Sequence, residues 1–222
     1  MSKSGHGLTH PDTSNRSRRC GLSRIGASNA SPGPSRKMTL MLLLPCLASA
    51  QQIQVTIDPA QTRIDWTLGA TMHTVHGTFK LKSGAVTFDP KSGEASGAIV
   101  VDASSGESGN QDRDKDMHTK VLESAKYPEI TFLPKHVIGS VAEQGQSNLQ
   151  VQGVLRIHGA DHDVTMSMKV DKTGDDIKAS TALVVPYQEW GMKNPSKMFL
   201  HVDNKVDVSI SAAGKMSAAT AR

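Results

Sequence analysis

Histidine is the side chain of this sequence best suited to acid–base or metal chemistry near neutral pH. Seven histidines follow position 51: His73, His76, His118, His136, His158, His162 and His201. His73 and His76 lie in an alternating segment typical of a strand, in which residues three apart point to opposite faces. His158 and His162 flank a turn. Neither pair comes with the third ligand of a zinc site, so we expect them to hydrogen-bond turns or line the mouth of a barrel. The sequence predicts no metal centre.

The serines between positions 104 and 108 are the other candidates for catalysis. Ser104, Ser105 and Ser108 stand close to Asp102 and Glu107, so a catalytic triad can be imagined. The chain lacks the Gly-x-Ser-x-Gly turn that exposes a catalytic serine in the α/β-hydrolases. It also lacks the glycine-rich fingerprints of dinucleotide and phosphate sites. We therefore expect no nucleophilic catalysis and no cofactor.

The densest polar stretch is Arg113-Asp-Lys-Asp-Met-His118. On a helix, Asp114 and His118 would be neighbours at positions i and i+4. The stretch is either a solvated helix face, or it places Arg113 or His118 at a barrel mouth against the polar end of a bound molecule. The rival hypothesis is a hydrolase- or isomerase-type enzyme, with His118 or His76 as acid–base group and Asp114 as its partner. No pattern specifies a reaction, so we expect a protein that is not an enzyme.

Most of the chain that must position these residues alternates apolar and polar side chains. This alternation is typical of half-buried strands. It is clearest in residues 64–68, 75–81, 95–101, 149–157, 164–170 and 206–212. We expect eight or nine strands joined by hairpins, without repeats or a second domain. Residues 110–122 instead show helical spacing, with Asn110 as N-cap and Pro128 beyond the end, which predicts one short inserted helix.

Strands with one apolar face must close into a barrel or pair as a sandwich. The inward candidates are mainly Val, Ile, Ala, Gly, Thr and Met, with few aromatic residues. An eight-stranded barrel has room for its own side chains or one slender ligand, and such small linings leave volume. A sandwich with a closed core suits the same composition, so both architectures remain open at this point.

The formal charge of +4 comes from the N-terminal segment. Residues 1–50 hold seven of the 25 basic residues and one of the 21 acidic ones, which leaves 18 basic and 20 acidic residues in 51–222. The domain from position 51 therefore lacks the basic excess that nucleic-acid binding requires. Both cysteines, Cys20 and Cys46, also precede position 51, so we expect no disulfide in the domain.

The first fifty residues have the organisation of an export signal. Residues 1–37 are rich in Ser, Gly and Arg and are either disordered or the result of a start codon assigned too early. Residues 38–50 contain an apolar run and end in Ala48-Ser-Ala50, a signal-peptidase pattern. We expect cleavage after Ala50 and a periplasmic or secreted protein consisting of residues 51–222. Lipoprotein processing at Cys46 is the alternative, although Leu44-Pro45 lacks the small residues it favours.

Five motifs together carry a family resemblance, and they occur in the order Met72–Phe79, Val101–Ser105, Gly109–His118, Tyr127–Phe132 and Gly153–Gly159. Within them the sequence reads Met-His-Thr-Val-His-Gly-Thr-Phe, Val-Asp-Ala-Ser-Ser, Gly-Asn-x-x-Arg-Asp-x-x-Met-His, Tyr-Pro-x-Ile-Thr-Phe and Gly-x-Leu-x-Ile-His-Gly. Chained in this way, they resemble the YceI-like family of polyisoprenoid-binding periplasmic proteins, over residues 53–214.

This resemblance implies a lipocalin-like antiparallel barrel of eight or slightly more strands, with a short helix over one opening. It implies that a long isoprenoid, either a polyprenyl phosphate or an isoprenoid quinone, threads the interior. Transient contact with a membrane surface and homodimer formation remain open. Residues 185–195 depart from the family pattern, and we expect Trp190 to reshape one end of the pocket. The predicted ligand-binding residues are Trp66, His73, Val75, His76, Phe79, Arg113, Asp114, Met117, His118, Phe132, Trp190 and Phe199.

Overall fold

The structure, a computed structural model, describes residues 52–71, 73–196 and 201–219. The predictions for the disordered segment 1–37, for the signal peptide 38–50 and for Phe199 lie outside these residues. No helix of the described ranges is long and apolar enough to span a membrane.

The domain consists almost entirely of antiparallel strands. They are β1 (Ile53–Ile57), β2 (Arg63–Gly69), β3 (Thr74–Phe88), β4 (Ala95–Glu107), β5 (Glu129–Ile138), β6 (Gly145–Ile157), β7 (Ala160–Thr173), β8 (Asp176–Val185) and β9 (Val206–Ala218). The helical segments are the 3-10 turn η1 (Pro59–Gln61), helix α1 (Gln111–Asp116) and the π-helical turn η2 (Met117–Val121).

Strands β1 and β2 occupy a single position in the sheet. Both pair with β3 on one side and with β9 on the other, β1 near one end of the barrel and β2 near the other. The break between them is η1, where Pro59 has no N–H for a ladder bond and the Asp58 side chain accepts a hydrogen bond from the Ala60 N–H. Nine strands therefore fill eight positions.

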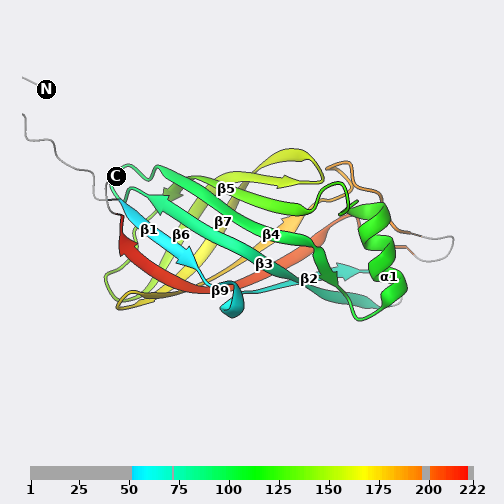
Figure 1. Ribbon diagram of the computed structural model, residues 1–222, viewed down its shortest axis with the longest axis horizontal. Coiled ribbons are helices and arrows are strands. Elements are labelled where there is room, and N and C mark those ends of the chain that lie inside the picture. Colours follow the sequence, from blue (N-terminus) through cyan, green and yellow to red (C-terminus); the bar gives the residue numbers. More distant parts are fainter. Residues whose placement is uncertain (1–51, 72, 197–200, 220–222) are drawn as a thin grey trace, which may run out of the picture. The chain divides into compact units, whose positions relative to one another are not determined.

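The sheet closes on itself. From β1 and β2 it passes through β9, β8, β7, β6, β5, β4 and β3, and the β3 pairings with β1 and β2 complete the circle. Figure 1 shows the strands wrapping around one interior, with α1 across one end. The predicted lipocalin-like antiparallel barrel with a short helix at its mouth is confirmed. The sandwich alternative is excluded by the closure.

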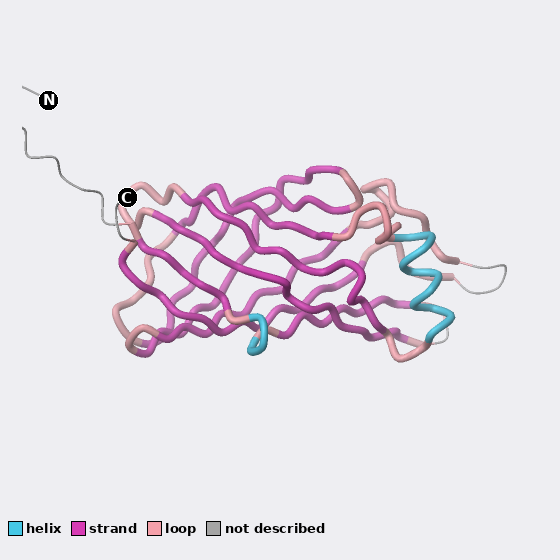
Figure 2. Tube along the Cα trace, in the orientation of Figure 1, coloured by secondary structure: helices cyan, strands magenta, loops and turns pink. Residues whose placement is uncertain are grey.

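The predicted helix begins where its N-cap was expected. The Asn110 side chain accepts a hydrogen bond from the Arg113 N–H, which satisfies one of the free donors of the first turn. The last turn widens into η2, where the Leu122 N–H bonds to the Met117 carbonyl five residues earlier. Figure 2 shows these helical turns lying across the barrel end. We call residues 110–124 the lid, and the end that they cover the helix end.

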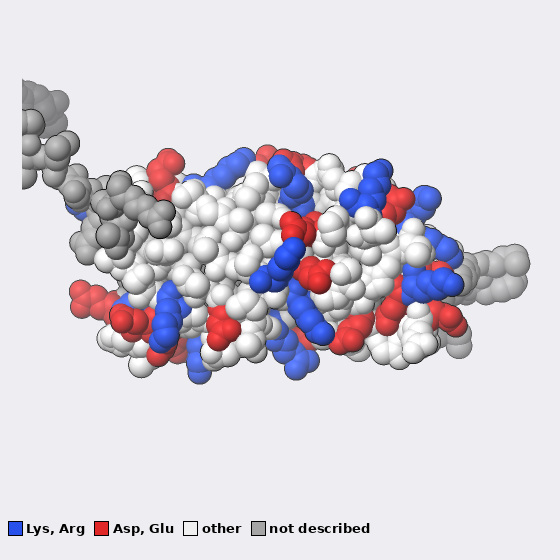
Figure 3. Space-filling view, viewed as in Figure 1, with Lys and Arg blue, Asp and Glu red and all other residues white. Residues whose placement is uncertain are grey.

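The outer surface mixes charges of both signs, as Figure 3 shows for one face. Several of them pair across neighbouring positions: Arg63 with Asp65, Lys82 with Glu129, Lys135 with Asp163, Arg156 with Asp161 and Lys215 with Asp176. Exposed pairs of this kind each contribute about 0–1 kcal/mol. The barrel therefore depends for its stability on its ladders and its apolar interior.

Candidate ligand-binding cavity

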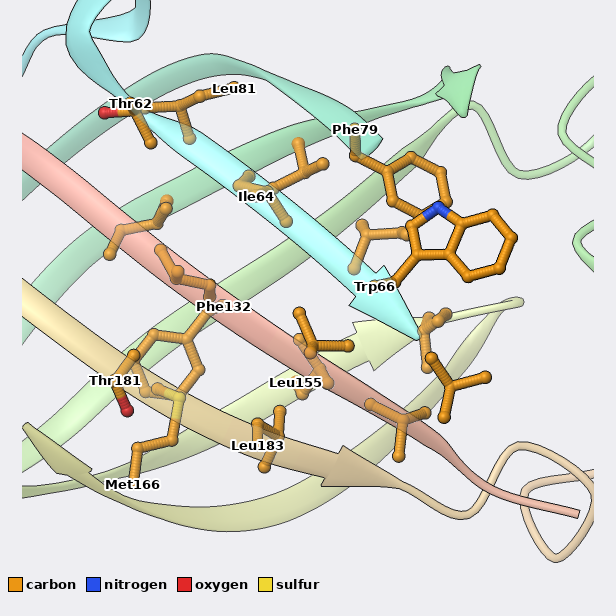
Figure 4. A pocket seen from close by; sticks show the side chains of 18 of the residues that line it. Thr62, Ile64, Trp66, Phe79, Leu81, Phe132, Leu155, Met166, Thr181 and Leu183 are labelled. Atoms are coloured by element: carbon orange, nitrogen blue, oxygen red, sulfur yellow. The ribbon is translucent and has the colours of Figure 1, made fainter. Parts of the chain in front are cut away.

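The interior of the barrel contains a cavity of about 590 Å³. Its lining extends from Val55 and Met216, at the end opposite the lid, to Asn110 and Asp112 at the helix end. Between these ends the wall is almost wholly apolar. Figure 4 shows side chains from several strands, among them Ile64, Phe132 and Leu183, projecting into this space.

Small inward side chains leave the space free. Ala179 and Ala212 face one another across the β8–β9 ladder and both line the cavity. On the same strands, the inward residues Leu183, Val208 and Ile210 are only half-buried. In a close-packed interior such residues would be covered by neighbouring atoms, so their remaining exposure is to the cavity itself.

Two aromatic rings lie flat on the wall because glycines stand beneath them. Trp66 is opposite Gly77 in the β2–β3 ladder, and a Cβ at Gly77 would come within 2.3 Å of the Trp66 ring. Phe132 covers Gly153 in the same way, with 2.7 Å from a Cβ to the ring. The glycines thus keep these rings out of the centre of the cavity. Phe79 stands beside Trp66, with 6.5 Å between ring centroids.

Hydrogen bonds of Ser108 hold the start of the lid at the end of β4. The Arg113 guanidinium donates from Nε to Ser108 Oγ at 2.7 Å and from Nη2 to the Ser108 carbonyl at 2.8 Å. Ser108 Oγ in turn donates to Asp114. The side chains of Arg113 and Asp114 therefore both help to fix the position of the lid.

His118 holds the middle of the lid. Its Nε2 lies 2.8 Å from the Gly106 carbonyl, and its Nδ1 lies 3.1 Å from Ser124 Oγ. A carbonyl only accepts, so Nε2 must carry a proton, and Nδ1 is free to accept from Ser124. The absence of a side chain at Gly106 lets the lid approach β4 closely, because a Cβ there would lie 2.9 Å from Met117 Cε. These contacts give His118 a structural task.

The polar end of the cavity lies beneath the lid. His73, Asn110, Asp112, Arg113 and Asp116 line it, and Lys120 pairs with Asp116 at 2.6 Å. Arg113 is the only lysine or arginine among the described lining residues. The mouth therefore carries two carboxylates, one of which is paired with Lys120, and one guanidinium that is already hydrogen-bonded.

Elsewhere in the wall, the hydroxyl groups are already used by the protein. Thr62 Oγ1 donates to the Asp58 carbonyl, Thr181 Oγ1 to the Ser167 carbonyl and the Tyr187 hydroxyl to the Asp203 carbonyl.

Burial, together with the nearby Asp203 carboxylate, raises the pKa of Tyr187 to about 12, so this hydroxyl stays protonated at neutral pH. The Trp66 Nε1 is buried without a hydrogen-bond partner. In the described ranges, no three metal-ligating side chains come together. The wall thus offers a bound molecule mainly apolar contacts and few free hydrogen-bonding groups.

Seven of the predicted ligand-binding residues line the cavity: Trp66, His73, Val75, Phe79, Arg113, Met117 and Phe132. Four others are placed outside its lining. His76 is exposed, with Nδ1 3.1 Å from Thr67 Oγ1. Asp114 and His118 are bonded within the lid as described above. Trp190 stacks on His162 of β7 and packs against buried residues of the two apolar clusters.

The sequence-based set omits most of the actual lining. Leu155, Met166, Thr181 and Leu183 line the cavity beside Phe132, and Asn110, Asp112 and Asp116 line the mouth. The strand residues carried a readable signal, since they occupy the inward phase of the alternation. For the mouth residues the helical spacing indicated a helix but not which of its side chains face the barrel.

A closed antiparallel barrel of eight strand positions around an apolar cavity defines the lipocalin-like class of folds, whose interior is just wide enough for side chains or one small ligand. The sequence profile of the YceI-like domain matches residues 55–213, and the chain belongs to this family. The resemblance seen in the sequence motifs is thereby confirmed.

Two bacterial proteins illustrate the sequence relationship. A UPF0312 protein from Pseudomonas putida is 27% identical over 175 residues, covering 73% of this chain and 86% of the relative. One from Vibrio parahaemolyticus is 26% identical over 142 residues, covering 63% of this chain and 73% of the relative.

Solved structures share the fold at lower identity. BcnA from Burkholderia cenocepacia superposes with a TM-score of 0.58 at 19% identity, covering 71% of this chain and 98% of BcnA. A polyisoprenoid-binding domain from Saccharophagus degradans gives a TM-score of 0.57 at 15% identity, covering 72% and 97%.

Proposed function

We propose that this protein binds a single long isoprenoid lipid inside the barrel and sequesters or carries it through an aqueous compartment. The observation that carries the proposal is the apolar cavity of about 590 Å³, within the range of small-molecule sites. The structural relative from Saccharophagus degradans, described as a polyisoprenoid-binding domain, supports the choice of an isoprenoid. The signal-peptide pattern before Gln51 supports the periplasm or the exterior as the compartment.

The dimensions of the barrel favour a long ligand. Strand β6 has 13 residues, and at about 3.3 Å per residue with a tilt of about 40° it spans about 30 Å along the barrel axis. This is about the thickness of the hydrocarbon core of a bilayer, which two acyl chains fill end to end. A molecule that fills the cavity along its length is therefore longer than one ordinary acyl chain.

The binding energy comes from removing apolar surface from water. Each buried methylene-sized group contributes about 0.8 kcal/mol, so ten such groups give about 8 kcal/mol. That corresponds to a Kd of about 1 μM, before the cost of ordering a flexible chain. An isoprenoid of several units has enough such groups for useful affinity without any polar contact.

The charges at the mouth favour a ligand whose polar end is uncharged. A phosphate there would meet the carboxylate of Asp112 and that of Asp116, the second of which is paired with Lys120. The one cation of the described lining, Arg113, already donates twice to Ser108. Of the two ligands expected from the family resemblance, an isoprenoid quinone fits this mouth better than a polyprenyl phosphate.

The enzyme hypothesis receives no support from the geometry. It needs His118 or His76 to exchange protons with a substrate. Both ring nitrogens of His118 are engaged, by Gly106 and Ser124. His76 does not line the cavity, and its Nδ1 faces Thr67. We therefore propose a binding protein without catalytic activity.

Native mass spectrometry tests the proposal. The protein would be purified gently from an isoprenoid-producing host, weighed intact, then extracted with organic solvent to identify its lipids. We expect a one-to-one adduct with the mass of an isoprenoid, on a chain that begins at Gln51. A protein that carries no lipid and takes up no added isoprenoid would overturn the proposal and make the enzyme hypothesis the leading one.

The preference for an uncharged end has its own test. Geranylgeraniol and geranylgeranyl phosphate share one chain and differ only at the end. We expect the alcohol to bind at least about tenfold more tightly, and Asp112→Asn to reduce that ratio. Asp171→Asn removes the same charge from the exposed outer face of β7 and serves as the matched control. Equal binding of the two probes would refute the charge argument and leave the apolar cavity argument intact.

A further inference from the structure

The wall of the barrel is incomplete between β7 and β8. Their ladder runs from Thr173 and Asp176 to Met168 and Thr181, and pairing between the two strands does not resume beyond it. The remaining residues, 160–167 of β7 and 182–185 of β8, still pair on their other sides with β6 and β9. We call the space between 160–167 and 182–185 the β7–β8 seam. It lies in the half of the barrel nearer the lid.

The ladder ends with a side-chain substitute. The last paired residues are Met168 and Thr181. Just beyond them, Thr181 Oγ1 donates to the Ser167 carbonyl at 2.8 Å, so a side chain occupies an acceptor that a longer ladder would use for a backbone N–H. Beyond this bond the two strand edges have no backbone link to each other. Closure of the wall there depends on side chains alone.

Trp190 is the side chain that covers the seam. It belongs to the turn after β8, and its ring stacks on the ring of His162 from β7, with 4.0 Å between centroids and 8° between planes. His162 lies opposite Leu155 in the β6–β7 ladder and shares its inward face. Trp190 also packs against the buried cluster of Phe132, Val151, Leu155 and Met166, all of which line the cavity. It packs as well against a second buried cluster, formed by Leu122, Ile157, Val185, Tyr187 and Met192. One layer of side chains therefore separates Trp190 from the cavity.

The stack on His162 closes the seam only weakly. Ring stacking contributes about 0.5–1.5 kcal/mol. His162 Nε2 is buried there without a hydrogen-bond partner, which costs about 1–3 kcal/mol. These two contributions offset one another, so the closed position of Trp190 is held mainly by burial of its ring against the neighbouring apolar residues.

The base of the Trp190 turn is much better held than its tip. Tyr187 and Met192, on either side of Trp190, are 4% and 3% exposed. The Tyr187 hydroxyl donates to the Asp203 carbonyl at 2.6 Å. The indole can therefore swing away while the turn stays anchored.

The lid at the helix end is held more firmly. His118 joins it to Gly106 and to Ser124, and His158 Nε2 lies 2.9 Å from Glu123 Oε2 next to Ser124. Hydrogen bonds of this kind contribute about 0.5–1.5 kcal/mol each. Lifting the lid breaks several of them, whereas moving Trp190 off the seam uncovers its ring and frees the buried His162 nitrogen.

We infer that the β7–β8 seam is a side opening of the barrel, through which the apolar chain of the ligand enters and leaves, with Trp190 as its movable cover. This inference rests on the proposed function, because it describes the route to the same cavity. It assigns to Trp190 control of exchange rates and not ligand affinity.

The probe for the test is all-trans-retinol, a neutral isoprenoid whose own fluorescence reports entry into an apolar cavity. Stopped-flow mixing gives its association rate, and transfer to phospholipid vesicles gives its release rate. We expect Trp190→Ala to raise both rates about tenfold, a barrier lower by about 1.4 kcal/mol, with Kd nearly unchanged. Trp190→Phe keeps an aromatic cover and should stay near the wild type.

Two further variants separate an opening from simple loss of packing. His118→Ala removes the hydrogen bonds that hold the lid to Gly106 and Ser124, without touching the cavity lining, and should leave the rates unchanged if the ligand uses the seam. Thr165→Cys with Val184→Cys places thiols at two exposed positions on opposite sides of the seam. A reducible bis-maleimide crosslink between them, in a chain that also carries Cys20→Ser and Cys46→Ser, should slow both uptake and release until reductant is added.

Several outcomes would overturn the inference. If Trp190→Ala raises only the release rate and weakens Kd, Trp190 merely packs against the ligand or the core. If the crosslink has no effect, or His118→Ala alone accelerates exchange, the ligand passes beneath the lid. If the wild-type protein binds neither retinol nor any extracted isoprenoid, the proposed function fails and the seam inference fails with it. Retinol binding with rates insensitive to Trp190 and the crosslink refutes the seam alone.

Discussion

Substitution of Ala212 by phenylalanine tests whether the interior is a working cavity. Ala212 lies on β9, faces Ala179 across the ladder and lines the cavity. A phenylalanine at this position directs its ring into the space that the two alanines leave open. The ladder of β9 with β8 continues past this residue, and on its other side Ala212 falls in the gap between the ladder with β2, which ends at Ser211, and the ladder with β1, which begins at Gly214.

Whether Ala212→Phe raises or lowers the free energy of unfolding depends on whether the cavity has room for the ring. Full burial of a phenylalanine side chain stabilises by about 1.5–3 kcal/mol, whereas forcing extra atoms into a packed core costs about 1–3 kcal/mol. The cavity of about 590 Å³ has room for the ring. We therefore expect Ala212→Phe to raise the free energy of unfolding by about 1 kcal/mol, since the ring stays partly open to the cavity.

The same ring should obstruct the ligand. Displacing about three methylene-sized groups of a bound chain costs about 2.4 kcal/mol, which is about sixtyfold in Kd. Urea unfolding followed by tryptophan fluorescence measures the first effect, and retinol titration measures the second. Ser211→Phe is the matched control, because the neighbouring Ser211 is exposed; its effects on both quantities should be small.

A destabilised Ala212→Phe variant would show that the interior is already filled, and the cavity argument would then be wrong. A stable variant that binds retinol as well as the wild type would instead place the ligand outside this part of the barrel. Only gain of stability together with loss of binding agrees with an open, ligand-holding interior.

Three other substitutions probe the wall and the lid. Gly77→Ala places a Cβ 2.3 Å from the Trp66 ring, so urea unfolding should show a loss of about 1–3 kcal/mol. His118→Ala removes the bonds to Gly106 and Ser124; hydrogen exchange should show faster opening of the lid with retinol binding retained, and loss of binding would contradict a structural role. The raised pKa of Tyr187, about 12, contributes stability that is full below about pH 10 and is lost as the pH rises through 12, by up to about 1.4 kcal/mol per pH unit. Tyr187→Phe should remove this part of the fall in unfolding free energy at alkaline pH.

Most of the fold could be predicted because its signals are local. Period-two alternation marked the long strands, and Asn110 marked the start of the helix, where its side chain does cap the first turn. The shared position of β1 and β2 was not predictable. It depends on both strands pairing with β3 and β9, and such non-local partners are set by closure of the whole sheet. Alternation alone fits a barrel and a sandwich equally well.

The candidate site was predictable only in part, for related reasons. Inward apolar residues such as Val75 and Phe132 follow from the phase of their strands. One partner of His118 is the carbonyl of Gly106, and a backbone acceptor cannot be recognised from residue type, so His118 resembled a functional histidine. Trp190 stood out as a departure from the family pattern. Its place over the seam depends on where the β7–β8 ladder stops, and residues 164–170 alternate on both sides of that point.

The features that the local patterns did not reveal are those that keep the interior open. Gly77 and Gly153 weaken their strands locally, yet they let Trp66 and Phe132 lie along the wall. The buried Nε2 of His162 lacks a partner where the wall is least complete. A sequence selected only for a stable barrel would have filled the cavity and completed the ladder, because local choices and global fold then agree. These departures share one interior, and a protein that must admit and release an apolar molecule through a closed sheet has a reason to keep them.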